Sequence, residues 1–255
     1  MSEVVLRRVA KAYGDVSVLE DIDLEVESGS FVTLVGASGC GKTTFLRLLL
    51  GQEAPSRGRI TVDGAPLADE PGPDRGIVFQ RYSVYPHLSV IENVALGLEF
   101  RESRWLGRLF GAARRRALER ADRLLQEVGL ARVRDAMPAA LSGGMQQRLA
   151  IAQALILEPR MLLLDEPFGA LDPGIRNDMH ELVTALWRET GTTVFMVTHD
   201  LREAFKLGTR VLTFDKVRLD PHEPDAYGAT ITYDLAGYNR RVPPEEEAAC
   251  VPAPS

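Results

Sequence analysis

The sequence predicts an α/β fold built around a mainly parallel sheet. Short apolar runs alternate with longer stretches of helical periodicity, as in folds where strands and helices follow one another. Two compact apolar runs, residues 30–36 and 161–164, are typical of strands that are buried on both faces. The mostly helical stretch from about 82 to 145 predicts a lobe attached to this core, and the strand-rich start predicts a second, smaller sheet.

The single elements follow from local signals in chain order. Alternating residues predict the first two strands, on either side of a turn at Gly14-Asp15. Gly51, Gly129 and Pro159 are expected to end three of the helices. The expected strands are 4–13, 21–29, 30–36, 57–64, 74–80, 161–167, 192–200, 210–219 and 229–235. The expected helices are 42–51, 89–100, 112–130, 141–159, 175–191 and 201–208, and a disordered tail is expected from Pro243.

Composition excludes several classes of protein. The 255 residues carry a formal charge of -6, which argues against nucleic acid as the main partner because phosphate backbones are bound by basic surfaces. The longest stretch without a charge, 28–41, is too short and too rich in Gly and Ser for a membrane span, and the start has no secretory signal pattern. Two cysteines, Cys40 and Cys250, build neither a disulfide framework nor a zinc cluster, so a reducing compartment is expected.

A glycine-rich loop follows the strand at 30–36 and precedes a helix. Its residues fit the pattern G-x-x-x-x-G-K-[ST], in which backbone N–H groups and a helix N-terminus surround phosphate groups. Lys42 would reach the β- and γ-phosphates, Thr43 would bind Mg²⁺, and Thr44 would reach an adjacent phosphate. Nucleotide binding alone does not define a function, because kinases, small GTPases and motor ATPases share this loop. The loop consists of Gly36, Ala37, Ser38, Gly39, Cys40, Gly41, Lys42 and Thr43.

Cys40 lies inside this loop. A helix N-terminus lowers thiol pKa values, so a reactive cysteine is one interpretation. The simpler interpretation, which we favour, is a small residue tolerated at a variable position.

Two acidic residues end the apolar strand that begins at Met161. Ligands of open α/β sheets lie at the carboxyl ends of the strands. Asp165 is therefore placed to hold Mg²⁺ through its water shell, and Glu166 to orient and deprotonate an attacking water. Without the glycine-rich loop, the same pair would be interpreted as an ordinary acidic strand end.

The segment Leu141-Ser142-Gly143-Gly144 is followed by a glutamine-rich helix start, about 20 residues before the acidic strand end. With this segment the sequence resembles the nucleotide-binding subunits of ATP-binding cassette (ABC) transporters, over about residues 3–218. Chemically it is a second anion site, made of the Ser142 hydroxyl, glycine N–H groups and a helix N-terminus. The resemblance implies that it caps the γ-phosphate of ATP held by a partner subunit.

Four more residues match the family's pattern by position. The resemblance implies that Tyr13 stacks on adenine and that Gln80 touches both Mg²⁺ and the attacking water. It implies that Asp172 communicates across the dimer, although it could simply cap the following helix. His199 stands where a histidine contacts the γ-phosphate. His87, His180 and His222 match no motif and are expected to be structural or exposed.

The resemblance also implies an architecture and partners. The fold would be a P-loop NTPase (RecA-like) core with an N-terminal antiparallel β subdomain and an inserted α-helical subdomain. Residues 3–218 would form the ATP-binding domain, 219–242 a strand extension and 243–255 a tail. Two copies, or one copy and a close paralogue, would close head to tail around two ATP molecules with Mg²⁺. They would dock on integral membrane permease subunits at the cytoplasmic face of the inner membrane, and a substrate-binding protein would take part indirectly.

The expected docking surface begins at Gln80 and includes Tyr82, Val84 and Tyr85, all expected to be exposed. Segment 99–116 is longer than the family pattern suggests, and the arginine-rich stretch 101–123 lies either near lipid headgroups or the permease, or on a solvated helix face. The chain after Leu219 is too short for a regulatory domain.

The substrate is not readable from the residues, because none of them touches the cargo. The sequence from 81 to 98 resembles importer ATPases of the nitrate/sulfonate/taurine group, and the segment 221–235 resembles subunits found with urea carboxylase systems. The alternative from another class is a soluble ABC-type ATPase acting on nucleic acid or ribosomes. Such proteins usually fuse two cassettes or insert long coiled coils, which this sequence does not do.

Overall fold

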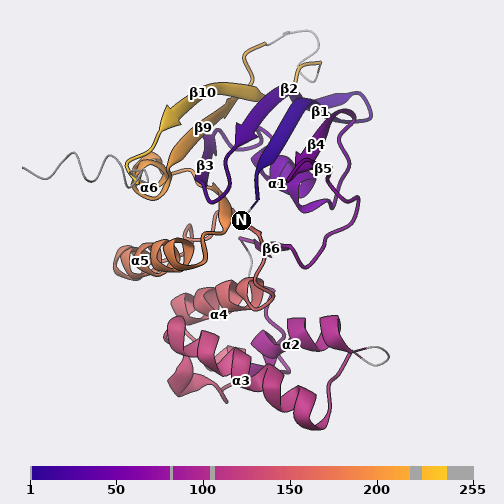
Figure 1. The fold of residues 1–255 in the computed structure, drawn as a ribbon. Helices are drawn as coiled ribbons and strands as arrows, with labels where there is room; N and C mark the ends of the chain where they lie inside the picture. Colours follow the sequence, from indigo (N-terminus) through magenta and orange to yellow (C-terminus); the bar gives the residue numbers. More distant parts are fainter. Residues whose placement is uncertain (1, 81–82, 104–106, 219–225, 240–255) are drawn as a thin grey trace, which may run out of the picture.

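The computed structural model describes residues 2–80, 83–103, 107–218 and 226–239 (Figure 1). Its larger sheet has the strand order β10-β9-β3-β8-β7-β6, with neighbours from β9 to β6 parallel and β10 antiparallel to β9. The mainly parallel sheet is therefore confirmed. Its strands are β3 (Phe31–Gly36), β6 (Arg75–Val78), β7 (Met161–Asp165), β8 (Thr193–Val197), β9 (Arg210–Asp215) and β10 (Thr230–Ala236).

A second, antiparallel sheet forms the N-terminal part, with the order β2-β1-β4-β5. It covers helix α1 at the upper right of Figure 1, as predicted for the N-terminal subdomain. The second strand begins earlier than expected, directly after the turn at Gly14-Asp15. These strands are β1 (Val4–Tyr13), β2 (Val16–Val26), β4 (Arg57–Val62) and β5 (Ala65–Pro66).

Three helices form the lobe at the lower end of Figure 1. Helix α4 packs against α2 and α3 and also against β6 and α5, so it joins the lobe to the sheet and runs beyond the expected boundary at 145. It ends at Leu155 and not, as predicted, at Pro159, because the residue before a proline is disfavoured in a helix and Glu158 has a φ of 53°. The helices are α1 (Lys42–Leu50), α2 (Val90–Glu102), α3 (Gly111–Glu127), α4 (Gly143–Leu155), α5 (Pro173–Thr190) and α6 (Leu201–Leu207), with short 3₁₀ turns at Ala131–Val133 and Pro138–Ala140.

The strand residues divide between two hydrophobic layers. In β7, Leu162 and Leu164 pack with the helical lobe and α5, whereas Met161 and Leu163 pack with α1 and the antiparallel sheet. Because successive side chains point to opposite faces, both faces of this strand are buried, which explains its continuous apolar sequence. The carboxyl end of the strand is thereby held rigidly, and this end carries Asp165.

Within the residues that the structure describes, none of the helices is both long enough and apolar enough to cross a membrane. The expected tail from Pro243 and His222 fall outside the described residues, as does Tyr82.

Candidate functional site

The candidate site lies where four neighbouring strands of the parallel sheet end. Gly36 ends β3 and Asp165 ends β7, while Gln80 and His199 follow β6 and β8 by two residues each. Carboxyl ends of parallel strands share one edge of the sheet, and this edge is where open α/β sheets bind ligands. The fold thus brings together the glycine-rich loop, the acidic pair, the glutamine and the histidine that the sequence singled out.

The glycine-rich loop folds tightly at the start of α1. Gly41 takes a φ of 86°, in the left-handed region that glycine adopts without strain, and a Cβ at Gly36 would lie 2.2 Å from the carbonyl oxygen of Phe214. Ala37, Ser38 and Gly39 are exposed, and no side chain of the described residues caps the helix start. The first N–H groups of α1 are therefore available to an anion.

Lys42 is 7% exposed and folds over its own loop. Its Nζ donates hydrogen bonds to the carbonyl oxygens of Gly36 (2.7 Å) and Ala37 (2.8 Å). A phosphate oxygen would be a stronger acceptor than either carbonyl, because both partners would then be charged. The ammonium group is held in the loop, ready to exchange these contacts for phosphate.

Cys40 is buried and packs in the layer that also contains Phe45 and Phe214. Its Sγ lies 3.5 Å from the Nζ of Lys42. The structure thus gives Cys40 the packing of a small core residue.

Thr43 and Asp165 meet across the gap between α1 and β7. The Thr43 hydroxyl donates to Oδ2 of Asp165 at 3.0 Å, and burial of this carboxyl raises the pKa of Asp165 above its ordinary value. A hydroxyl and a carboxylate are the hard oxygen ligands that Mg²⁺ takes together with phosphate oxygens, so these two side chains fit the metal. Among the described residues no cluster of three or more His, Cys, Asp or Glu could hold a metal ion.

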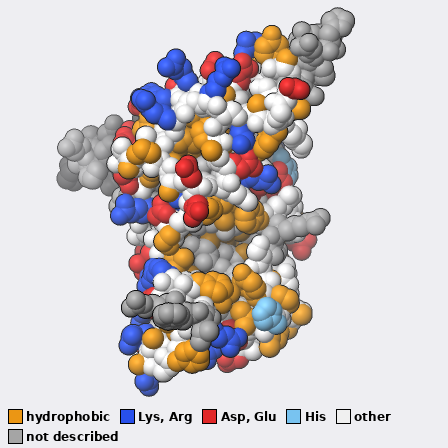
Figure 2. Space-filling model, turned by 90° about the vertical axis from the view of Figure 1, so that its right-hand side faces the viewer, with side chains coloured by type: hydrophobic (Ala, Val, Ile, Leu, Met, Phe, Trp, Pro, Cys, Tyr) orange, Lys and Arg blue, Asp and Glu red, His pale blue; other side chains and the backbone are white. Residues whose placement is uncertain are grey.

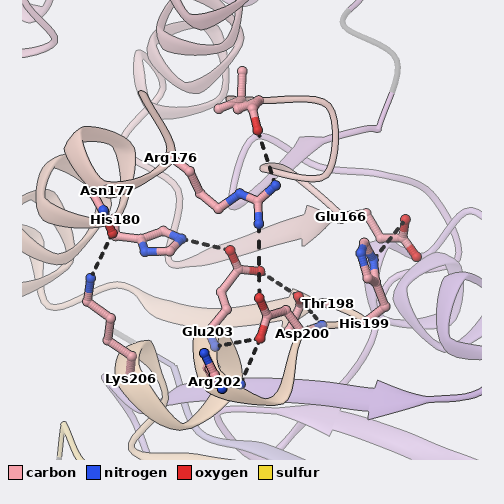
Figure 3. Close-up of polar contacts among 11 residues, drawn as sticks. Glu166, Arg176, Asn177, His180, Thr198, His199, Asp200, Arg202, Glu203 and Lys206 are labelled. Carbon is pink, nitrogen blue, oxygen red and sulfur yellow. Dashed lines mark hydrogen bonds and ion pairs between the residues drawn. The ribbon is translucent and has the colours of Figure 1, made fainter. Parts of the chain in front are cut away.

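Glu166 follows Asp165 in the chain and contacts Gln80 and His199, the second of which is drawn beside it in Figure 3. Its Oε2 accepts a hydrogen bond from Gln80 Nε2 at 3.1 Å and lies 3.8 Å from Nδ1 of His199. The backbone of Glu166 has a φ of 47°, a conformation that costs a residue with a side chain on the order of 1 kcal/mol. Such strain persists where the surroundings hold the residue, and here it directs the carboxylate toward the edge of the sheet.

Tyr13 lies at the end of β1, with its ring 44% exposed. Its hydroxyl donates to Glu53, and the pKa of Tyr13 is raised, first by burial of the hydroxyl and then by this bond, with Thr44 also in reach. Tyr13 is therefore beside the glycine-rich loop and partly open to solvent, with Nζ of Lys11 lying over its ring at 4.9 Å from the centroid. Glu53 was not singled out from the sequence, because nothing in its spacing marks it as a partner of β1.

The second anion site stands apart from this cluster within the chain. Ser142 caps α4 through a hydrogen bond from the N–H of Met145 (3.4 Å), and Ser142 and Gly143 are exposed. Gly144 is buried, and a Cβ there would lie 2.6 Å from Cγ2 of Ile175. Asp172 is exposed at the start of α5 and makes no side-chain capping bond. Ser142, Gly143 and Asp172 are thus exposed, whereas Gly144 packs against α5 of its own chain.

A groove of about 300 Å³ lies between β6, α2 and α4, beside the loop that Gln80 begins. Phe79, Tyr85 and Phe100 line it, and Tyr85 and Phe100 are 42% and 60% exposed. Figure 2 shows hydrophobic side chains gathered on this side of the molecule, between its upper and lower parts. Val84 was expected to be exposed, which is wrong: it is half-buried, because it packs on the core of the helical lobe.

Comparisons with known proteins agree on one family. Residues 19–169 match the family described as ABC transporter. The chain is 47% identical to the aliphatic sulfonates import ATP-binding protein SsuB 2 of Pseudomonas aeruginosa, over 83% of this chain and 72% of that protein. It is 47% identical to the taurine import ATP-binding protein TauB of Rhizobium johnstonii, over 80% and 74%.

Solved structures show the same architecture. A dimeric structure of MJ0796, a bacterial ABC transporter cassette, matches with a TM-score of 0.75 and 30% identity, covering 91% of this chain and 98% of that chain. A post-hydrolysis state of the same cassette, bound to ADP and Pi, matches with a TM-score of 0.73. The P-loop NTPase core with an antiparallel β subdomain and a helical subdomain is therefore confirmed. The chain belongs to the ABC transporter family, as a cassette that binds and hydrolyses ATP.

Proposed function

We propose that this chain powers the import of a small sulfonate-like solute through separate permease subunits at the inner membrane. The named relatives that support this import sulfonates and taurine, and their similarity covers most of this chain. The same relatives disfavour a soluble ATPase acting on nucleic acid or ribosomes, as does the net charge of -6. A substrate-binding protein would select the solute, since this chain offers it no contact.

Residues at the four strand ends, together with Tyr13, would each have a separate role in binding and hydrolysing ATP. Lys42 binds the β- and γ-phosphates in exchange for its two carbonyl contacts, and Tyr13 stacks on the adenine. Glu166 orients a water molecule and removes its proton, while His199 contacts the γ-phosphate from the next strand.

Mg²⁺ would be held by Thr43, Asp165 and Gln80 together with phosphate oxygens. When bound, it would neutralise negative charge on the phosphates. The raised pKa of Asp165 reflects the cost of keeping this carboxylate buried, and a cation beside it would offset that cost.

A second copy of the chain would complete each site. The exposed Ser142, Gly143 and Asp172, with the backbone of Gly144, make no contact with the phosphate loop of their own chain among the described contacts. Placed against a partner's ATP, the start of α4 supplies N–H groups and the partial charge of a helix N-terminus. Closure of the dimer is then driven by ATP, which binds the closed form more tightly.

Permease subunits would dock in the groove beside the Gln80 loop. Tyr85 and Phe100 offer aromatic surface there, and the groove adjoins the loop whose first residue contacts Glu166. A docked helix would thereby be linked to the state of the nucleotide. In this proposal residues 3–218 form the cassette with its helical subdomain, and the chain lies at the cytoplasmic face of the membrane.

The observation that carries the hydrolytic part of the proposal is the contact of Glu166 with both Gln80 and His199 at the edge that also holds Lys42 and Asp165. We predict that Glu166→Gln retains ATP binding and lowers kcat by about 10²–10³ or more, because the amide cannot accept the proton of water. Steady-state hydrolysis and fluorescent-nucleotide binding measure the two effects. Turnover near that of the wild type in the purified variant would refute the role of Glu166.

A further inference from the structure

A buried polar pair lies beneath the loop that carries His199 (Figure 3). His180 of α5 and Glu203 of α6 are 5% and 6% exposed, and His180 Nε2 lies 2.7 Å from Oε1 of Glu203. A buried carboxylate needs such a donor, because an unpaired one is costly to remove from water. The sequence offered no role for His180, which matches none of the family's motifs.

The second oxygen of Glu203 fixes the backbone on both sides of His199. The Thr198 hydroxyl donates to Oε2 of Glu203, and the same hydroxyl accepts a hydrogen bond from the N–H of Asp200 at 3.1 Å. His199 stands between Thr198 and Asp200, so one hydroxyl ties its two neighbours together. Glu203 thereby determines where the exposed imidazole of His199 is presented.

The other face of His180 contacts the segment that carries Glu166. The ring of Phe168 packs edge-on against the imidazole, with 5.0 Å between ring centroids, and Phe168 is 1% exposed. Phe168 follows Glu166 by two residues. Nδ1 of His180 is buried without a hydrogen-bond partner among the described residues, which suits the tautomer with its proton on Nε2, donated to Glu203.

A second side chain of α5 supports the same arrangement. Arg176 donates to the carbonyl oxygen of Leu171 at 3.1 Å, and its Nη1 lies 4.0 Å from Oδ2 of Asp200. The start of α5 is therefore linked to the far side of the His199 loop as well. Helix α5 contacts both catalytic segments, although none of its own residues lies at the edge of the sheet.

We propose that His180 is a positioning residue that fixes the Glu166 carboxylate and the His199 imidazole relative to each other. It acts through Phe168 on one segment and through Glu203 and Thr198 on the other, and the two side chains so placed lie 3.8 Å apart. This inference rests on the proposed roles of Glu166 and His199. Misplacing a reacting group by about 1 Å can lower a rate by up to about 10²-fold without weakening the binding of substrate.

The test uses four variants of the whole chain. His180→Leu removes the donor, and Thr198→Val removes the hydroxyl while keeping its shape and the charge balance of the buried pair. His180→Gln keeps an N–H donor near the position of Nε2 and serves as the rescue. Val183→Ala, which opens a cavity one turn along the same helix without removing a polar group, is the matched control for lost stability.

We expect His180→Leu and Thr198→Val to lower kcat about tenfold to hundredfold, with KM for ATP and monomer nucleotide affinity within about twofold of the wild type. His180→Gln should regain most of the lost kcat, and Val183→Ala should lower Tm while keeping kcat per folded molecule. The positioning role is overturned if Thr198→Val keeps wild-type kcat, if His180→Gln is as impaired as His180→Leu, or if Val183→Ala loses as much turnover. If His180→Leu does not fold, the kcat values of Thr198→Val and His180→Gln still test the positioning role.

His199→Ala separates this inference from the function on which it rests. If His199→Ala turns over normally, the proposed role of His199 itself is wrong. If His199→Ala is inactive while Thr198→Val and His180→Leu hydrolyse ATP at the wild-type rate, the positioning role alone is refuted.

Discussion

Helices α1 and α4 both begin at glycine-rich segments, yet different side chains of the chain surround their N-termini. At α1 the chain supplies its own counter-groups: Lys42 lies over the loop, and Asp165 contacts Thr43. At α4, Ser142 and Gly143 are exposed, and among the described residues the side chain of Ser142 caps the N–H of Met145. Among the described residues, the start of α1 has counter-groups from its own chain, whereas the start of α4 has only its own cap. In the proposed dimer, the first half of the pocket would be preformed in the monomer and the second would be used between copies.

The largest loss of activity is expected from a substitution at the start of α1, and it would test this comparison most directly. We predict that Lys42→Ala lowers both nucleotide affinity and turnover by about 10² or more, because the buried ammonium is the only full positive charge that the loop offers the phosphates. Isothermal titration with ATP and a hydrolysis assay measure the two. Lys206→Ala is the matched control, since Lys206 is exposed and donates to Asn177 on the surface. ATP affinity like that of the wild type in Lys42→Ala would show that α1 is not the phosphate site.

A change at the start of α4 should lower turnover but leave ATP binding by the monomer intact. Gly143 has open space around it, so Gly143→Asp folds and places a negative charge where the partner's phosphate would dock. We predict normal ATP binding by the monomer and a loss of turnover of about 10²-fold. Mixed one to one with Lys42→Ala, it should regain about a quarter of wild-type activity, because half of the dimers then hold one intact site.

Two outcomes would break the comparison. If Gly143→Asp hydrolyses ATP normally, the start of α4 takes no part in the site. If the mixture stays inactive although both variants dimerise, the two half-sites do not come from different chains.

Much of this could be predicted from the sequence, and the exceptions share a physical cause. Local periodicity and short motifs placed the strands, the helices and the residues at the sheet edge, because these depend on neighbours within a few residues. The pair His180 and Glu203 joins positions 23 residues apart on two helices, and Tyr13 with Glu53 joins positions 40 apart. Such contacts are set by how elements pack, which no spacing in the chain records. Val84 was misplaced for the same reason: whether a loop residue faces solvent depends on what the lobe leaves uncovered.

The smallest predicted effect concerns the stability that the protein loses by burying the Asp165 carboxylate beside α1. Burial raises the pKa of Asp165 above its model-peptide value of 3.8, so the folded chain binds this proton more tightly than the unfolded chain does. The ionised carboxylate therefore lowers stability at pH values above the raised pKa, and this cost disappears as the pH falls below 3.8. Asp165→Asn keeps an oxygen to accept the Thr43 hydroxyl but carries no charge. Without nucleotide we expect its Tm at pH 7 to rise by roughly 2–4 °C, the shift that about 1 kcal/mol produces in a chain of this length.

The pH dependence of the rise in Tm shows whether it comes from removing the buried charge of Asp165. Thermal unfolding of Asp165→Asn and the wild type across pH 4–8 should show a difference that is largest at neutral pH and shrinks toward pH 4, because the wild-type carboxyl is then increasingly protonated in the folded state. Asp15→Asn, at an exposed turn, is the control for the change of residue type. A variant less stable than the wild type at pH 7 would mean that the contact with Thr43 outweighs the cost of burial. The empty α1 site would then cost the protein no stability, like the start of α4. The two helix ends would differ only in how far their residues are exposed.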